Sequence, residues 1–130
     1  MLIRFRYLDN NCAVAFNTGS RIVDPQTNFH LWLTHETVVQ FVEQYRNSAN
    51  LAAQHNRPMI MFETNTGSCG GFPGISNVFA AALWIADYGM RLASVGFDSA
   101  LLHIGGQNAY YNVCRIMWFS FHRNTTNSWF

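Results

Sequence analysis

The residue of this sequence best suited to catalysis is Glu63, the last residue of the run at 59–63 (MIMFE). Four apolar residues in succession predict a strand covered on both faces, as in a parallel sheet. Glu63 is predicted to end this strand, and in (β/α)8 barrels the reactive groups lie at the carboxyl ends of the strands. A carboxylate there could serve as a nucleophile, a base or a metal ligand. The alternative is a carboxylate that caps the following loop or pairs with an arginine.

Other polar and glycine residues lie near the ends of the predicted strands. His103 is near the end of a second buried strand at 99–104, where it lines the same pocket or is a core histidine bonded to backbone. The pairs Gly70–Gly71 and Gly105–Gly106 allow backbone amides to approach a ligand, or simply form tight turns. The pair Tyr110–Tyr111 is suited to stacking on a sugar, with core packing as the alternative. No phosphate-binding glycine pattern is present.

Strands and helices are predicted to alternate along the chain. Residues 8–33 and 64–74 are predicted to be irregular, because they are rich in Gly, Pro, Asn and Asp. Alternating strands and helices indicate an α/β fold with a parallel sheet and right-handed crossovers. Three strands are too few for a stable doubly wound sheet, so a segment of a larger β/α fold is favoured. The predicted elements are a strand at 2–7, a helix from about Thr34 to His55, a strand at 59–63, a helix at 76–94 and a strand at 99–104.

The composition restricts the class of protein. The 130 residues are 49% hydrophobic and only 12% charged, which argues against intrinsic disorder. All eight basic residues are arginines and they are scattered, so no nucleic-acid partner is expected. No apolar stretch reaches the roughly 18 residues of a membrane span, and the first residues lack the features of an export signal. The three cysteines are too far apart for a zinc knuckle, and neither a metal nor a cofactor is expected.

Three separated motifs, taken together, point to a known family. They are MFETNTGSCGGFPGIS at 61–76, ALWIADYG at 82–89 and LHIGGQNAYYN at 102–112. In this order they resemble glycoside hydrolase family 79, the β-glucuronidase and heparanase family, and in particular its fungal members. The resemblance extends from about residue 7 to Asn112.

The resemblance implies a fold and an activity. The family combines a catalytic (β/α)8 barrel with a β domain and hydrolyses β-linked glucuronides with retention of configuration, outside the cell. It implies that Glu63 is the nucleophile at the end of the seventh barrel strand, acting on a glycan or glucuronide substrate. It also implies a disulfide between Cys12 and Cys69, with Cys114 left as a free thiol, and the alternative is three free thiols. The residues that it implies in the sugar pocket are Asn65, Gly70, Gly71, His103, Gly106, Asn108, Tyr110 and Tyr111.

One half of the catalytic machinery has no counterpart in the sequence. Retaining glycosidases use two carboxyl groups about 5 Å apart. The family's acid/base glutamate follows an Asn at the end of the fourth barrel strand, and neither Glu36 nor Glu43 matches this motif. Residues 1–112 are therefore predicted to be a partial (β/α)8 TIM barrel, about strands six to eight with their helices. Residues 113–130, where the resemblance stops, are expected to be a gene-model artefact, with a genuine divergent tail as the alternative.

These observations predict a fragment of a retaining β-glucuronidase-like glycoside hydrolase that carries the nucleophile and lacks the acid/base. The isolated chain is predicted to be inactive. The alternatives are a non-catalytic carbohydrate-binding fragment and a chain with no independent function.

Overall fold

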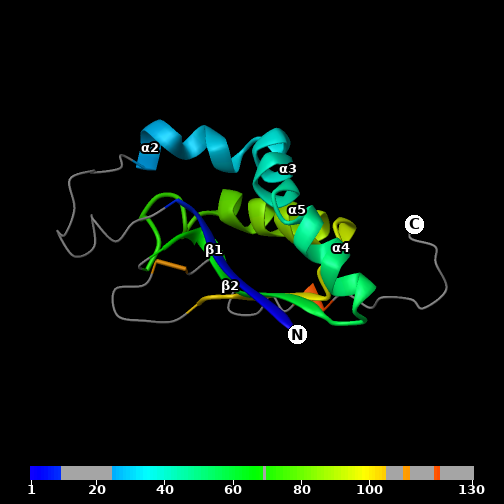
Figure 1. The fold of residues 1–130 in the computed structure, drawn as a ribbon. Helices are drawn as coiled ribbons and strands as arrows, with labels where there is room; N and C mark the ends of the chain where they lie inside the picture. Colours follow the sequence, from blue (N-terminus) through cyan, green and yellow to red (C-terminus); the bar gives the residue numbers. More distant parts are fainter. Residues whose placement is uncertain (10–24, 69, 105–109, 112–118, 121–130) are drawn as a thin grey trace, which may run out of the picture.

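A four-stranded sheet forms the base of the molecule (Figure 1). The computed structural model describes residues 1–9, 25–68, 70–104, 110–111 and 119–120. The strand order is β1-β2-β3-β4, with β1 parallel to β2 and β2 parallel to β3, whereas β4 is antiparallel to β3. The strands are β1 (Leu2–Asp9), β2 (Met59–Gly67), β3 (Ser99–Leu102) and β4 (Phe119–Ser120). The three predicted parallel strands are confirmed, and β4 was not predicted.

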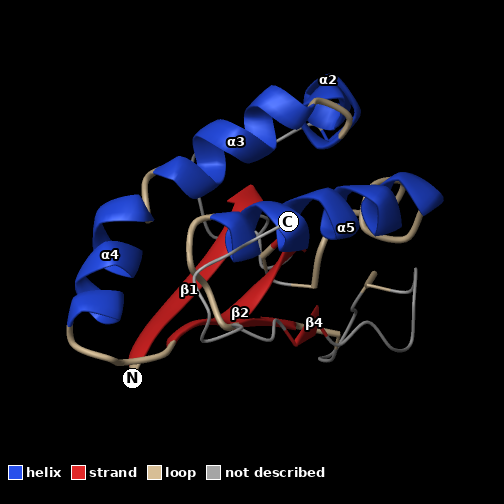
Figure 2. Ribbon diagram, turned by 90° about the vertical axis from the view of Figure 1, so that its right-hand side faces the viewer, coloured by secondary structure: helices blue, strands red, loops and turns tan. Residues whose placement is uncertain are grey.

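The helices lie on one side of this sheet, so the described residues form two layers (Figures 1 and 2). Helix α5 packs across β2 and β3, as the strand–helix–strand order predicts, and α3 packs on α5. No helix among the described residues is long and apolar enough to cross a membrane. The helical segments are α2 (Pro25–Asn28), the 3-10 helix η1 (Phe29–Trp32), α3 (His35–Glu43), α4 (Arg46–Gln54) and α5 (Phe79–Ser94).

The helix boundaries differ from the prediction at three places. Residues 25–32, predicted to be irregular, are helical, because Pro25 suits the first position of a helix rather than ending it. The helix predicted from Thr34 to His55 is divided in two, since the amide of Tyr45 bonds to the carbonyl of Val42 and tightens the turn. The helix predicted at 76–94 begins only at Phe79, three residues later.

The core lies between the sheet and the helices. Tyr88 of α5 is fully buried and stacks on Trp84, with ring centroids 4.8 Å apart at 11°. Its ring also meets Phe41 of α3 at 5.6 Å, so one side chain joins the two helices. The sheet supplies Met59, Met61 and Ala100 to the same cluster. The helix predicted from about Thr34 to His55 contributes apolar side chains at helical spacing to this core, namely Val38, Val42, Tyr45, Ala49 and Ala52, with Phe41 partly buried.

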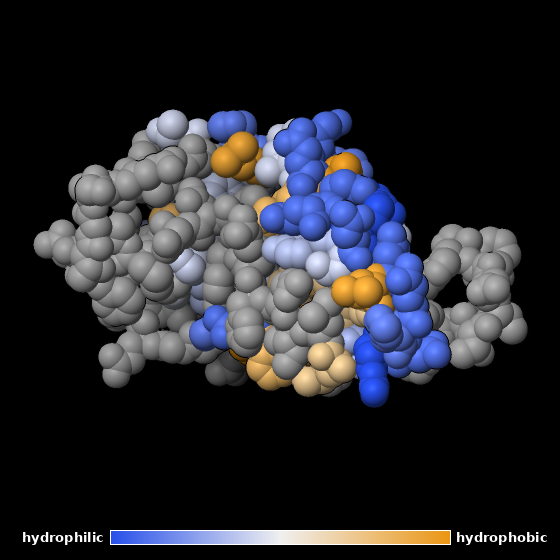
Figure 3. Space-filling model, viewed as in Figure 1, coloured by the Kyte–Doolittle hydropathy of each residue, from blue (hydrophilic) through white to orange (hydrophobic). Residues whose placement is uncertain are grey.

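Ion pairs surround this apolar contact between α3 and α5. Glu43, at the end of α3, accepts hydrogen bonds from Arg46 and from Arg91 of α5, the latter at 2.7 Å. The hydrogen bond from Arg46, followed by the charges of both arginines, lowers the pKa of Glu43. His35 and Asp87 form a second pair across the same contact at 2.9 Å. The outer side of α3 and α4 is correspondingly mostly hydrophilic (Figure 3).

Candidate active site

Strand β2 continues to Gly67, four residues beyond its predicted end, so Glu63 lies within the strand and not at its terminus. The prediction stopped the strand at the Gly-rich loop, but Thr64 and Thr66 are β-branched and favour extended backbone. The strand is irregular at this point. Arg4 of β1 pairs with Met61, whereas the next residue, Phe5, pairs with Glu63.

The same irregularity is present on the other side of β2. Met61 pairs with Ala100 and Thr64 pairs with Leu102, so two residues of β2 lie opposite a single residue of β3. An extra residue relative to both neighbours is a β-bulge, which changes the face on which the following side chains lie. Among the residues after the bulge, Thr64 is buried and its hydroxyl donates to Tyr88 of α5 at 3.3 Å.

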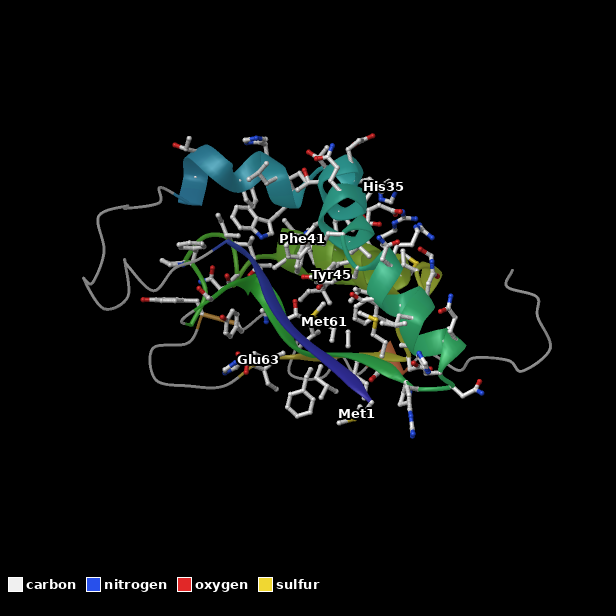
Figure 4. The ribbon with its side chains drawn as sticks, viewed as in Figure 1. Met1, His35, Phe41, Tyr45, Met61 and Glu63 are labelled. Carbon is white, nitrogen blue, oxygen red and sulfur yellow. The ribbon has the colours of Figure 1, made fainter. Side chains whose placement is uncertain are left out.

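The bulge determines which side of the sheet carries Glu63. Side chains alternate between the two faces of a strand, so without it Glu63 would follow Met61 into the helix-covered core. With it, Thr64 takes that face and Glu63 lies on the side of the sheet away from α3 and α5 (Figure 4). The Glu63 side chain is 38% exposed. The structure therefore places this acid where a ligand can reach it.

The structure brings His103 to this carboxylate. Its Nδ1 lies 3.1 Å from Oε1 of Glu63, and the imidazole is 37% exposed. His103 follows the last residue of β3, and its amide donates to the carbonyl of Thr64 at 3.0 Å. Parallel pairing thus continues one residue past β3. Of the two alternatives for His103, this exposure does not fit a buried core histidine, and a role in a pocket stays a prediction.

Asn65 is directed into the protein. The side chain is 3% exposed, and its amide nitrogen donates to the carbonyl of His103 at 2.7 Å. Its Oδ1 accepts from the amide of Thr66 at 2.7 Å. Both ends of the carboxamide are therefore engaged with protein groups. In this arrangement Asn65 joins the ends of β2 and β3.

A buried polar network continues from Asn65 into the Gly-rich loop. The hydroxyls of Thr66 and Ser76 lie 2.6 Å apart, and Ser76 accepts from the amide of Phe72 at 2.9 Å. The indole of Trp32 donates to the carbonyl of Thr66 at 3.0 Å. Sequence reasoning missed these residues as site-forming, because no local pattern distinguishes a hydroxyl in a buried network from one in a turn.

The two tyrosines have different surroundings. Tyr111 is buried, its hydroxyl donates to the carbonyl of Gly67, and its ring lies 5.8 Å from the imidazole of His103. Tyr110 is exposed, and its amide donates to the carbonyl of Gly70 at 2.6 Å. Core packing therefore describes Tyr111, while Tyr110 retains the exposure that stacking on a sugar requires.

Several predicted site residues lie outside the described residues. These are Gly106, Asn108 and both members of the predicted disulfide, Cys12 and Cys69. Their roles stay predictions. In the part of the chain that the structure describes, no group of three or more His, Cys, Asp or Glu side chains could hold a metal ion.

Gly71 is required by both its backbone and its surroundings, and this leads to a test. Its φ is +80°, and a Cβ would lie 2.5 Å from Oγ of Ser76 and 2.7 Å from the ring of Tyr111. We expect Gly71→Ala to lower the free energy of unfolding by about 3 kcal/mol, since backbone strain and overpacking add. Urea unfolding measures this loss.

Gly74→Ala is the matched control. Gly74 has a similar φ of +78°, but its Cβ would approach only the end of the Gln26 side chain, at 3.0 Å. This substitution introduces the backbone strain without the buried clash, and we expect a loss of about 1 kcal/mol. Equal losses in the two variants would contradict the packing that the structure shows around Gly71.

A partly exposed carboxylate beside an imidazole on a parallel sheet can act as a nucleophile or a base. Similarity to known proteins restricts the class of protein that carries it. The comparisons confirm the predicted resemblance to fungal β-glucuronidases. The chain is 45% identical over 53 residues to a β-glucuronidase of Neurospora crassa, across 41% of this chain. It is 33% identical over 112 residues to a β-glucuronidase of Aspergillus niger, across 79% of this chain. These matches span 10% and 21% of the lengths of the two relatives.

A solved structure has a similar fold. It is a 4-O-α-L-rhamnosyl-β-D-glucuronidase from Fusarium oxysporum, with a TM-score of 0.66 and 23% identity. The similarity covers 84% of this chain and 21% of that protein. No family model matches the sequence. The chain is thus similar to a limited segment of fungal glucuronidases in both sequence and fold.

Proposed function

We propose that this chain is a segment of a retaining β-glucuronidase-like glycoside hydrolase of family 79, with Glu63 as its nucleophile and a β-linked glucuronide as the substrate. The observation that carries the proposal is the bulge in β2, which brings Glu63 out of the core and beside His103. The similarity to fungal β-glucuronidases supplies the substrate class.

The chemistry requires a carboxylate that a sugar can reach. In a retaining reaction the carboxylate attacks the anomeric carbon and forms a glycosyl ester, while a second carboxyl protonates the leaving oxygen. Water then hydrolyses the ester with the second residue acting as base. Glu63 has the exposure that the first role needs.

The second carboxyl group is proposed to come from outside this chain. Glu36 and Glu43 both belong to α3, on the helix-covered side of the sheet, whereas Glu63 lies on the opposite side (Figure 4). Glu43 is also engaged by Arg46 and Arg91. Neither glutamate can therefore approach a sugar bound at Glu63, because the sheet separates them.

The exposed apolar side chains support a larger assembly, which we take to be a (β/α)8 barrel to which this chain contributes about strands six to eight. Helix α5 carries a stripe of Phe79, Leu83 and Met90 with exposed fractions of 74%, 57% and 64%. Spacings of four and seven residues put them on one face of the helix. Phe62, at the bulge, is 45% exposed. The remainder of a barrel and its β domain would cover such surfaces.

A chimaera tests the proposal. The matching part of this chain would replace the segment of the Aspergillus niger β-glucuronidase to which it aligns, and the rest of that enzyme is expected to supply the acid/base and the remaining strands. We expect the chimaera to hydrolyse an aryl β-glucuronide and the isolated chain to show no turnover, since general acid catalysis alone contributes roughly 10²–10⁴-fold. Turnover by the purified isolated chain would contradict the proposal, as would a folded chimaera without activity. Glycan binding by the isolated chain that Glu63→Gln leaves unchanged would favour a carbohydrate-binding fragment instead.

A further inference from the structure

Two separate contacts hold the backbone of His103 on β2. Its amide donates to the carbonyl of Thr64 at 3.0 Å, and its carbonyl accepts from Nδ2 of Asn65 at 2.7 Å. The imidazole packs beside Tyr111, whose hydroxyl is bonded to the carbonyl of Gly67. Every one of these partners except Tyr111 belongs to β2, the strand that also carries Glu63. The positions of the imidazole and of the carboxylate are therefore determined by the same strand.

The contact between His103 and Glu63 bears on which imidazole nitrogen carries a hydrogen. Nδ1 of His103 lies 3.1 Å from Oε1 of Glu63, and an ionised carboxylate only accepts hydrogen bonds, so a hydrogen bond between the two requires the hydrogen to be on Nδ1. In the neutral imidazole this selects the tautomer protonated at Nδ1, and in the imidazolium both nitrogens are protonated. A hydrogen bond to the ionised form of a carboxyl group favours that form, which is the nucleophilic one.

We infer that Asn65 is a positioning residue for Glu63 and acts through His103. The Asn65 amide holds the His103 carbonyl, and His103 in turn donates from Nδ1 to the carboxylate. The inference rests on the proposed function for its catalytic consequence, although the tautomer of His103 is independent of any activity. Asn65 is thus inferred to position His103 and not to contact the sugar, in agreement with its 3% exposure.

The spectroscopic test uses the whole 130-residue chain labelled with ¹⁵N in its five histidines. Long-range ¹H–¹⁵N correlation spectra distinguish the two neutral tautomers, and a His103→Gln sample assigns the signal. We expect neutral His103 to be protonated at Nδ1, and Glu63→Ala to shift its population toward protonation at Nε2. Protonation at Nε2 in the unsubstituted chain would overturn the inference, and so would a tautomer that does not respond to Glu63→Ala.

The test of Asn65 itself uses two variants and a control. Asn65→Asp keeps the size of the side chain and the oxygen that accepts from the amide of Thr66, but it removes the nitrogen that donates to the carbonyl of His103. Asn65→Ala removes both hydrogen bonds without burying a charge. In both variants we expect neutral His103 to populate the Nδ1-protonated and the Nε2-protonated tautomers together. Asn50→Asp, on the exposed surface of α4, is expected to leave the spectrum unchanged. An unchanged His103 signal in folded Asn65→Ala would overturn the positioning role.

The kinetic test separates positioning from sugar binding. In the active chimaera, Asn65→Ala is expected to lower kcat by about 10- to 100-fold, with KM for an aryl β-glucuronide within about twofold, because small displacements of reacting groups have effects of this order. A raised KM with unchanged kcat would assign Asn65 to substrate binding and overturn the inference. An inactive chimaera would refute the proposed function, while the tautomer measurement would still decide the inference.

Discussion

Glu63→Gln in the chimaera is expected to abolish hydrolysis of an aryl β-glucuronide, with turnover reduced on the order of 10³-fold or more. An amide cannot form the glycosyl ester that retention of configuration requires. The substitution keeps the size of the side chain and an oxygen that can accept from Nδ1 of His103, which lies 3.1 Å from the carboxylate. The lost rate therefore reports the missing nucleophile and not a disturbed fold.

Two further measurements sharpen this prediction. Glu36→Gln, in the exposed first turn of α3, is expected to leave turnover unchanged. In Glu63→Ala, added azide is expected to enter the space left by the carboxylate and give a glucuronyl azide of inverted configuration, which identifies the residue as the nucleophile. An azide product of retained configuration would instead identify Glu63 as the acid/base. Full activity in Glu63→Gln would refute its catalytic role.

Tyr88→Ala is expected to have the largest effect on stability. Tyr88 is fully buried, stacks on Trp84, meets Phe41 of α3 and accepts from the hydroxyl of Thr64 of β2. Its truncation leaves a cavity where two helices and the sheet meet, and we expect the free energy of unfolding to fall by about 3–5 kcal/mol. This is a large fraction of the stability of a small domain, so far-UV circular dichroism during urea unfolding would detect it readily.

Two matched variants test whether the loss of stability comes from the ring of Tyr88, from its hydroxyl, or from removing any large apolar side chain of α5. Tyr88→Phe keeps the ring and removes the hydroxyl with its bond to Thr64, and is expected to have an effect of about 1 kcal/mol. Leu83→Ala, on the exposed face of the same helix, is expected to stay within about 0.5 kcal/mol of the parent. A loss in Leu83→Ala equal to that in Tyr88→Ala would show that this face of α5 is covered and would contradict the packing described for Tyr88.

Much of the site could be predicted because its elements depend on local patterns. The apolar run that ends at Glu63 predicted a buried parallel strand, and His103 near the end of the next strand predicted a second group at the same edge. The structure brings these two side chains within 3.1 Å of each other. Their proximity follows from the parallel register of β2 and β3, in which Thr64 pairs with Leu102. The carboxamide of Asn65 could not be placed in this way, since its partner His103 is 38 residues away.

The sequence by itself determined the alternation of strands and helices, the buried face of α3 and α4, and the residue types available for chemistry. These depend on the spacing of apolar residues within one segment. Only the tertiary structure decided that Glu63 faces away from the core, because the bulge in β2 is defined by its register with both β1 and β3. A shift of one residue reverses every following side chain, and the energy that selects the register is contributed by the whole sheet and by the helices packed on it.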